Sequence, residues 1–150
     1  MRLISPYGSR IRRGACALLV MADGKILLHL RSKDAWIYGG SWAFFGGGVE
    51  RRESSYQGLS RELGEEIGSR VFPVHRLIDS SRHVKKCGRG FVRVDDDTYY
   101  IEVESWRRFH LKEGQDMRLF TLDEALQLKL PPHERKIITM LLHRRQRLAT

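Results

Sequence analysis

The sequence predicts an α/β fold in which a mixed β-sheet packs between helices. Two apolar, strand-length runs joined by Asp23-Gly24 predict a β-hairpin over residues 14–31, because Asp-Gly is a strong turn signal. Apolar residues recur at helical spacing over 54–67 and again over 134–147, which predicts two amphipathic helices. Strand-like and helix-like segments interleave along only 150 residues, which indicates one domain over residues 1–150.

The first half of the chain is predicted to form the hairpin, a loop and a capped helix. Polar and glycine-rich residues 32–41 predict the loop, and an apolar run over 42–45 then leads into three glycines at 46–48. The helix is expected to begin at Ser54, whose spacing to Gln57 fits a capping box. It is expected to end at Gly68, where a left-handed C-cap belongs.

The second half is predicted to contain two strands, a short helix and the final helix. Residues 71–78 and 98–106 have strand-like composition, and a basic stretch over 82–93 lies between them. Thr121 is a plausible N-cap for a short helix over 122–127. Two prolines at 131–132 open the final helix, since proline is favoured in a first helical turn.

Composition and charge restrict the functional classes. Lys and Arg number 27 against 18 Asp and Glu, a formal net charge of +9, which favours an anionic partner such as nucleic acid, a phosphorylated small molecule or a membrane surface. No apolar run approaches the ~20 residues of a membrane span, and the basic N-terminal segment 1–13 does not resemble a secretory signal. Two cysteines form no disulfide framework, so we expect a cytoplasmic protein, with Cys16 in the core and Cys87 a loop thiol.

One cluster of acidic residues stands out in this basic chain. Glu62, Glu65 and Glu66 share one face of the predicted helix, beside its apolar stripe. Clustered carboxylates repel each other, and their oxygens are the ligands that Mg²⁺ or Mn²⁺ prefers. A lone cluster of this kind is more often a solvated helix face, so the neighbouring residues decide the interpretation. Glycines before the helix would let backbone groups approach a metal or a diphosphate, and Glu53 and Arg61 are spaced to pair.

The complete segment resembles the signature of the Nudix hydrolases, G-x5-E-x7-R-E-U-x-E-E-x-G-U, where U is aliphatic. The matching positions are Gly47, Glu53, Arg61, Glu62, Leu63, Glu65, Glu66 and Gly68. Ser69 departs from the final aliphatic position, and Phe45 stands where family members often have proline. The preceding hairpin, the W-x-F-x-G-G entry at 42–47 and the final helix also look like Nudix architecture, which is an α/β/α sandwich.

The resemblance implies an enzyme, its metal and its substrate class. Glu62, Glu65 and Glu66 would hold Mg²⁺, or Mn²⁺ as a substitute, with the Gly46 carbonyl as a further ligand. Glu53 and Arg61 would orient the loop and the helix. The reaction would be hydrolysis of a diphosphate bond in a nucleoside diphosphate linked to another moiety, with a nucleoside triphosphate or a nucleotide sugar favoured. The family also makes a homodimer plausible.

Residues outside the signature are expected to complete the site. The general base would be Glu62 or Glu113, since the segment 112–115 resembles a loop that supplies a fourth carboxylate in some Nudix enzymes. Arg31 and Lys33 are candidates for contacts with substrate phosphates, although a solubilising loop edge is an equal alternative. The aromatic residues near the signature are candidates for stacking on a base, with packing as the alternative. These candidates are Trp42 and Phe44, with Trp36 and Tyr38 nearby.

Two alternative functions are suggested by the net positive charge. One is a Nudix-fold module that binds RNA or a nucleotide without cleaving it, and the other is a hydrolase that acts on RNA 5′ ends. Lys85, Lys86 and Arg89 of the basic stretch would then contact RNA. The six histidines show no ligand spacing and are predicted to be structural or solvated.

Overall fold

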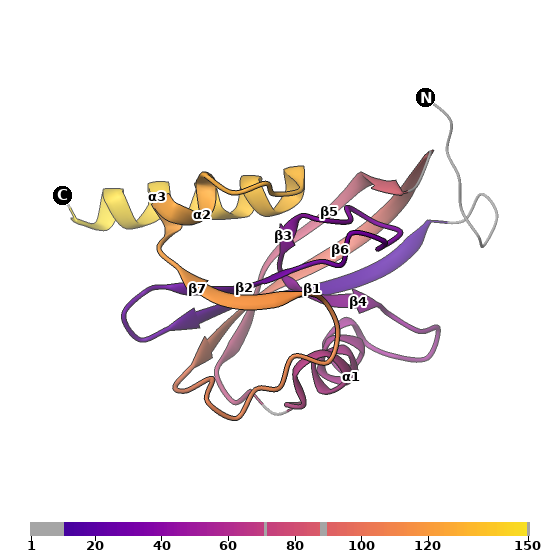
Figure 1. Cartoon of the computed structure of the whole chain (residues 1–150), viewed down its shortest axis with the longest axis horizontal. Coiled ribbons are helices and arrows are strands. Elements are labelled where there is room, and N and C mark those ends of the chain that lie inside the picture. Colours follow the sequence, from indigo (N-terminus) through magenta and orange to yellow (C-terminus); the bar gives the residue numbers. More distant parts are fainter. Residues whose placement is uncertain (1–10, 71, 88–89, 150) are drawn as a thin grey trace.

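The protein consists of a mixed β-sheet with helices on both faces (Figure 1). The computed structural model describes residues 11–70, 72–87 and 90–149. The strands are β1 (Arg12–Met21), β2 (Ile26–Leu30), β3 (Trp42–Ala43), β4 (Phe45–Gly48), β5 (His75–Cys87), β6 (Gly90–Val103) and β7 (Asp116–Phe120). The helices are α1 (Ser55–Ile67), α2 (Leu122–Leu126) and α3 (Pro132–Ala149).

Strand β1 is the centre of the sheet. The main path runs β3-β2-β1-β6-β5, while β4 also pairs with β1 and β7 with β2. The pairing of β1 with β6 is parallel, and the other pairings are antiparallel. Cys16 is therefore opposite Gly46 on one side and Thr98 on the other. This register places the glycine segment and the middle of β6 on two sides of the same strand.

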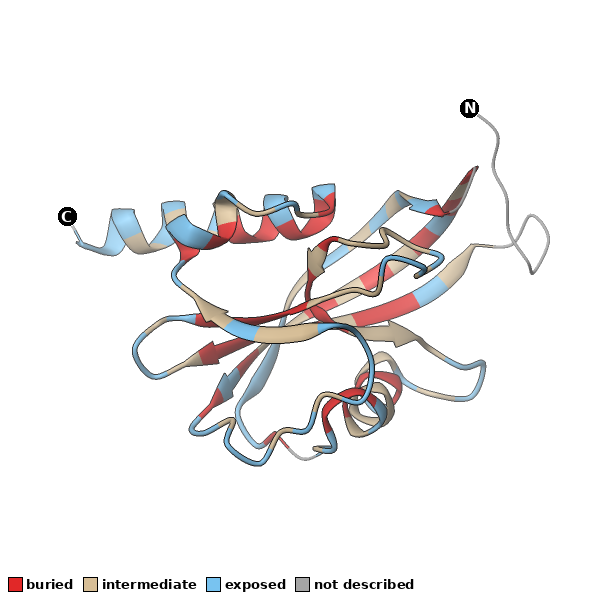
Figure 2. Cartoon of the chain, viewed as in Figure 1, coloured by how far each residue is buried: buried red, intermediate tan, exposed pale blue. Residues whose placement is uncertain are grey.

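Alternate residues of β1 supply two separate cores. Ala15, Ala17 and Leu19 pack with the apolar stripe of α1. Leu18 and Val20 point to the opposite face, where they pack with α2 and α3. Figure 2 shows the corresponding burial of α3, which is buried toward the sheet and exposed on its outer side. The predicted mixed sheet between helices is therefore what the chain forms.

Helix α1 has the predicted caps. The Ser54 side chain accepts from the backbone N–H of Gln57, and the Gln57 side chain accepts from the Ser54 backbone N–H. Gly68 ends the helix in the left-handed conformation, with φ 76°. These caps fix where α1 begins and ends beside the glycine segment.

The region after α1 differs from the prediction. The basic stretch is no connection between two shorter strands, because β5 and β6 continue through it as one long antiparallel hairpin. Asp95, Asp96 and Asp97 lie opposite Arg82, Ser81 and Ser80, so acidic residues of β6 support the extended pairing. Cys87 is buried at the end of β5, packed with Val92 and Val94, and is therefore not a loop thiol. Strand β7 was not predicted, and α3 begins two residues earlier than expected.

None of the helices in the described part of the chain combines the length and apolar character needed to cross a bilayer.

Truncation of the α1 core contact should destabilise the fold. Leu63 is fully buried between α1 and β1, so Leu63→Ala should lower the free energy of unfolding by about 2–5 kcal/mol. Leu148→Ala is the matched control, because Leu148 is 81% exposed and its truncation should change stability by less than ~0.5 kcal/mol. Urea denaturation measures both variants. Equal effects of the two substitutions would contradict this assignment of the core.

Candidate functional site

The glycine segment of β4 lies directly against the acidic face of α1. The backbone N–H of Gly46 donates a 2.8 Å hydrogen bond to Oε1 of Glu66. Gly46 has φ 144°, and a Cβ there would collide with the backbone of Ala15. A Cβ on Gly47 would lie 2.5 Å from the carboxyl carbon of Glu62. Two glycines in sequence therefore allow β4 to approach two of the helix carboxylates closely.

Arg61 connects the acidic residues to the loop that precedes the helix. Its guanidinium donates to both carboxylate oxygens of Glu53, each at 2.9 Å, and to the Gly48 carbonyl at 2.9 Å. The same group contacts Glu62 at 3.0 Å and Glu65 at 3.3 Å. Bidentate arginine–carboxylate contacts have strongly directional geometry. Arg61 thus holds the loop, β4 and the acidic face of α1 in one arrangement.

The negative charge of the clustered carboxylates exceeds the positive charge beside them. Burial raises the pKa of Glu66 to about 8, and the negative charges of Glu62 and Glu113 act in the same direction. Burial also raises the pKa of Glu62, and repulsion from Glu65 and Glu113 adds to this effect. A bound divalent cation would offset both burial and repulsion. Glu62, Glu65 and Glu66 therefore form a donor set that fits Mg²⁺ or Mn²⁺.

His29 lies behind Glu66 and was not anticipated from the sequence. Its Nε2 is 3.1 Å from the Phe44 carbonyl oxygen and 3.8 Å from a Glu66 oxygen, and its ring stacks on Phe45 at 4.6 Å. Burial, followed by the charge of Arg31, lowers the pKa of His29 to about 4. The imidazole is consequently uncharged at pH 7, so it provides no positive charge to offset the negative charge of Glu66. In the described chain its Nδ1 is buried without a hydrogen-bond partner.

A cavity of about 500 Å³ opens beside these residues. Its lining includes Gly46, Glu66, Arg31 and Glu113, together with Phe44. Arg31 is held in place by a 2.7 Å hydrogen bond from its Nε to the carbonyl of Ile37. Arg31, Phe44 and Glu113 thus line the same cavity as Glu66.

Two other predicted contact residues lie elsewhere. Neither Lys33 nor Trp42 is among the described residues that line the cavity. Lys33 is exposed on the loop that follows β2. Trp42 packs edge-on against Phe120 at 5.0 Å, beside the core under α2 and α3. Phe44 also belongs to that core and is only 5% exposed.

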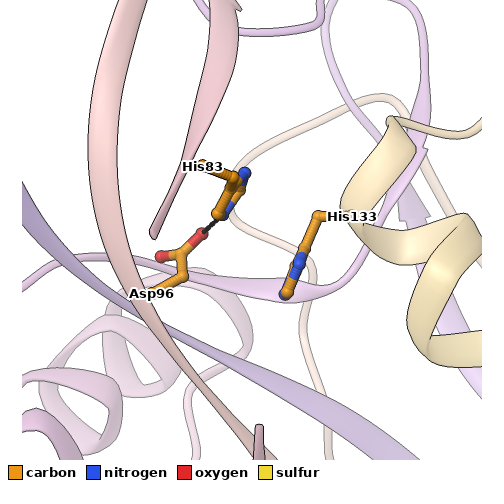
Figure 3. A group of neighbouring side chains, drawn as sticks. All are labelled: His83, Asp96 and His133. Carbon is orange, nitrogen blue, oxygen red and sulfur yellow. Dashed lines mark hydrogen bonds and ion pairs between the residues drawn. The ribbon is translucent and has the colours of Figure 1, made fainter. Parts of the chain in front are cut away.

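The cavity is also lined by a second cluster of ionisable residues, here called the inner cluster, and Figure 3 shows three of its members, His83, Asp96 and His133. Asp96 lies 2.7 Å from His83 Nε2 and 2.7 Å from Lys85 Nζ, through the same carboxylate oxygen. His133 Nε2 is 2.8 Å from the Thr98 hydroxyl, and its ring stacks on that of His83 at 4.6 Å. Glu134 follows at the start of α3 and also lines the cavity.

Sequence reasoning missed this inner cluster because its members are far apart in the chain. Strands β5 and β6 supply His83, Lys85 and Asp96, while α3 supplies His133 and Glu134. The available signal was the run of three aspartates, 95–97, which could have been paired with the basic stretch. Histidine spacing gave no such signal.

The basic stretch is largely engaged with these aspartates. Arg82 makes a two-pronged contact with Asp95, at 2.8 and 3.2 Å, and Lys85 is turned inward onto Asp96. Lys86 is exposed, and Arg89 lies outside the described residues. Of the three residues expected to contact RNA, Lys85 is therefore turned inward and paired with Asp96.

Comparisons with known proteins identify relatives of this chain. The family model of the NUDIX domain matches residues 10–141. A nucleoside triphosphatase, NudI, of Escherichia coli O139:H28 is 40% identical over 53 residues, which are 35% of this chain and 38% of that protein. The NudI of Klebsiella pneumoniae 342 is 37% identical over 57 residues, or 38% and 40% of the two chains. The matches thus span about two fifths of the length of these curated relatives.

Solved structures extend the similarity to the complete fold. A MutT protein from Methanosarcina mazei Go1 has a TM-score of 0.73 at 21% identity, over 92% of this chain and 97% of that one. The NUDIX domain of Shewanella oneidensis NrtR, solved with ADP ribose, has a TM-score of 0.71 at 20% identity, over 94% and 93%. At this identity the similarity establishes the fold, and it confirms the α/β/α architecture predicted from the sequence.

Removal of one buried charge should stabilise the metal-free protein at high pH. The folded-state pKa of Glu66, about 8, is above its ordinary value of 4.5, so wild-type stability should fall as the pH rises through this interval. The Glu66→Gln side chain still offers an acceptor to the Gly46 N–H, but it does not ionise, so the variant should not lose stability as the pH rises. With EDTA present, the variant should exceed wild type by at least ~1 kcal/mol at pH 9 and differ little at pH 4.5.

Urea denaturation at the two pH values measures this difference. Glu102→Gln on an exposed position of β6 is the matched control, and it should follow wild type at both pH values. A Glu66→Gln variant no more stable than wild type at pH 9 would show that the carboxylate is not destabilised by its burial.

Proposed function

Because the chain belongs to the Nudix family, we propose that it is a divalent-metal-dependent hydrolase of phosphoanhydride bonds in nucleotides. A nucleoside triphosphate is the preferred substrate class, and a nucleotide sugar is the second. The observation that carries this proposal is that the β4 glycines lie against Glu62 and Glu66, of which Glu66 lines the cavity, while Arg61 contacts both Glu62 and Glu65. The NudI relatives, named as nucleoside triphosphatases, support the substrate class.

The helix carboxylates would hold the metal, Mg²⁺ or its substitute Mn²⁺, with the Gly46 carbonyl as a further ligand. Gly46 and Gly47 allow the backbone to lie against Glu66 and Glu62, and the Gly46 N–H fixes one oxygen of Glu66. When bound, such an ion stabilises negative charge on phosphate oxygens and lowers the pKa of a coordinated water. Arg61 would orient two of the carboxylates, since it contacts Glu62 and Glu65 while it is hydrogen-bonded to Glu53 and to the Gly48 carbonyl of β4.

Glu113 and Glu62 are the two candidates for the group that would accept a proton from the attacking water. Glu113 lies close enough to raise the pKa values of both Glu62 and Glu66, and it lines the cavity. Glu62 is the second candidate, because burial and repulsion raise its own pKa and thereby increase its basicity. His29 is unsuited to this role, since its Nε2 is held beside the Phe44 carbonyl and its pKa is lowered.

The remaining contacts would bind the substrate. Arg31 lines the cavity near Glu66, and a guanidinium there is suited to substrate phosphate oxygens. Phe44 contributes apolar surface to the cavity lining. Lys33 and Trp42 do not line this cavity, so we assign them no contact with the substrate. The cavity volume of about 500 Å³ is within the range of small-molecule sites.

Loss of the metal-binding carboxylates should abolish hydrolysis. With Mg²⁺ and a panel of nucleoside triphosphates and nucleotide sugars, the purified chain should release phosphate, diphosphate or a nucleoside monophosphate. Glu65→Gln and Glu66→Gln should each lower kcat/KM by at least ~100-fold, since each removes charge from the metal site. Mass spectrometry of the products identifies the bond that is cleaved.

Glu102→Gln is again the matched control, because Glu102 is exposed on β6 and outside the cavity. Its kcat/KM should equal that of wild type. Rates in Glu65→Gln and Glu66→Gln that match the control would reject the proposed active site.

A further inference from the structure

Two histidines and one aspartate of the inner cluster lie where three elements of the fold meet (Figure 3). Strand β5 supplies His83, β6 supplies Asp96 and α3 supplies His133. Each residue offers one potential ligand atom, and these three atoms all lie within 4.8 Å of one another. Asp96 is 2% exposed and His133 6% exposed, so the packing of α3 and the sheet already holds these two groups in place. The arrangement therefore needs little ordering to bind an ion.

The protonation states of Asp96 and His133 suit a cation. Burial acts to raise the pKa of Asp96, but the contacts with His83 and Lys85 outweigh burial and hold this pKa well below its usual range. Burial, followed by the charge of His83, lowers the pKa of His133 to about 4, so its ring is uncharged at pH 7 and keeps the lone pair that a metal binds. One ring nitrogen of His133 lies 2.8 Å from the Thr98 hydroxyl, and a partner of this kind commonly orients a metal-binding imidazole.

The contact between His83 and Asp96 is one that a metal ion would replace. The Nε2 atom of His83 lies 2.7 Å from an oxygen of Asp96, so a cation inserted between these atoms would bind both. The rings of His83 and His133 stack at 4.6 Å and 15°, so one ring must rotate before both can bind the same ion. The His83 side chain is 22% exposed and lines the cavity, which gives it room to rotate.

Lys85 competes with a cation for this position, and Glu134 limits the competition. The ammonium group of Lys85 lies 2.7 Å from the Asp96 oxygen that His83 also contacts. Burial raises the pKa of Glu134 to about 7, and the charge of Lys85 opposes this rise. Glu134 therefore offers Lys85 a second carboxyl group when a metal ion takes its place on Asp96. One ammonium group for two carboxyl groups leaves the cluster able to accept further positive charge.

The donor set differs from that of the α1 carboxylates. Two imidazole nitrogens and one carboxylate oxygen suit Zn²⁺, Co²⁺ or Ni²⁺, whereas Mg²⁺ and Mn²⁺ prefer oxygen ligands. All three residues line the cavity, from which water can complete the coordination. The two sites are also separate in space. Gly46 and Thr98 flank Cys16 of β1 on its two sides, and a strand spacing of about 4.8 Å places them ~10 Å apart.

We propose that His83, Asp96 and His133 form a second metal site, which binds a transition-metal dication of the Zn²⁺ and Co²⁺ class with water as the fourth ligand. This site goes beyond the proposed hydrolase function, because neither its ligands nor its test involves turnover. Absence of hydrolysis would reject the proposed function and leave the second metal site standing.

Cobalt binding tests the site directly. Four-coordinate Co²⁺ absorbs visible light strongly, while six-coordinate Co²⁺ in an oxygen site absorbs weakly. Added to chelator-treated wild-type protein, Co²⁺ should produce a strong band that saturates at about one equivalent and disappears when Zn²⁺ is added. His133→Gln should weaken this binding by at least ~100-fold, because it removes one ligand.

His143→Gln is the matched control, since His143 is exposed on the same helix, and it should bind Co²⁺ as wild type does. Glu66→Gln, in the carboxylate site, should also keep the band. A wild-type protein without the strong band, an equal band in His133→Gln, or loss of the band in Glu66→Gln would overturn the proposal.

Lys85→Met provides a test that a folding defect cannot imitate. Removal of the competing ammonium group should tighten Co²⁺ binding by at least ~10-fold, because a cation on Asp96 then displaces no positive charge. Binding that is unchanged or weaker in this variant would contradict the site. In the wild-type protein with excess Mg²⁺, added Zn²⁺ should shift the NMR signals of the His83 and His133 rings and leave those of His143 in place. Zn²⁺ that shifts neither ring would also overturn the proposal.

Discussion

The contacts of Arg61 are the constraint on which the rest of the site depends. One guanidinium joins Glu53 of the loop, the Gly48 carbonyl of β4 and two carboxylates of α1. Without this cation the acidic face would contain only mutually repelling groups. Its positive charge is nevertheless insufficient, because its contacts with Glu53, Glu62 and Glu65 do not extend to Glu66, which remains buried with a raised pKa. The site is therefore organised by Arg61 and left with the negative charge that a divalent cation requires.

The central strand explains how both ends of the cavity arise from one sheet. Residues of β1 alternate between the α1 core and the α3 core, and its two neighbours at Cys16 are the glycine segment and β6. Glu66 of α1 lines the cavity beside β4, where Gly46 and Gly47 leave space for Glu66 and Glu62. The inner cluster reaches it from β5, β6 and α3. The small residues 14–16 of β1 also line this cavity.

The sequence predicted best where the signal was local. The caps at Ser54 and Gly68, the spacing of the α1 glutamates and the Asp23-Gly24 turn all depend on residues within a few positions of each other. The β5–β6 hairpin was predicted poorly, because polar strands with charged residues on one face resemble a loop in composition. The inner cluster could not be predicted, since the proximity of His83 to His133 depends on the packing of α3 against β6.

The central claim is that the α1 carboxylates form one cation site, and Mn²⁺ binding followed by electron paramagnetic resonance tests it most directly. Free Mn²⁺ should disappear from the spectrum as wild-type protein is added. Glu66→Gln should weaken this binding by at least ~10-fold, through the loss of one charged ligand, while Glu102→Gln should bind as wild type does. Mn²⁺ affinity that is the same in Glu66→Gln and wild type would contradict the account.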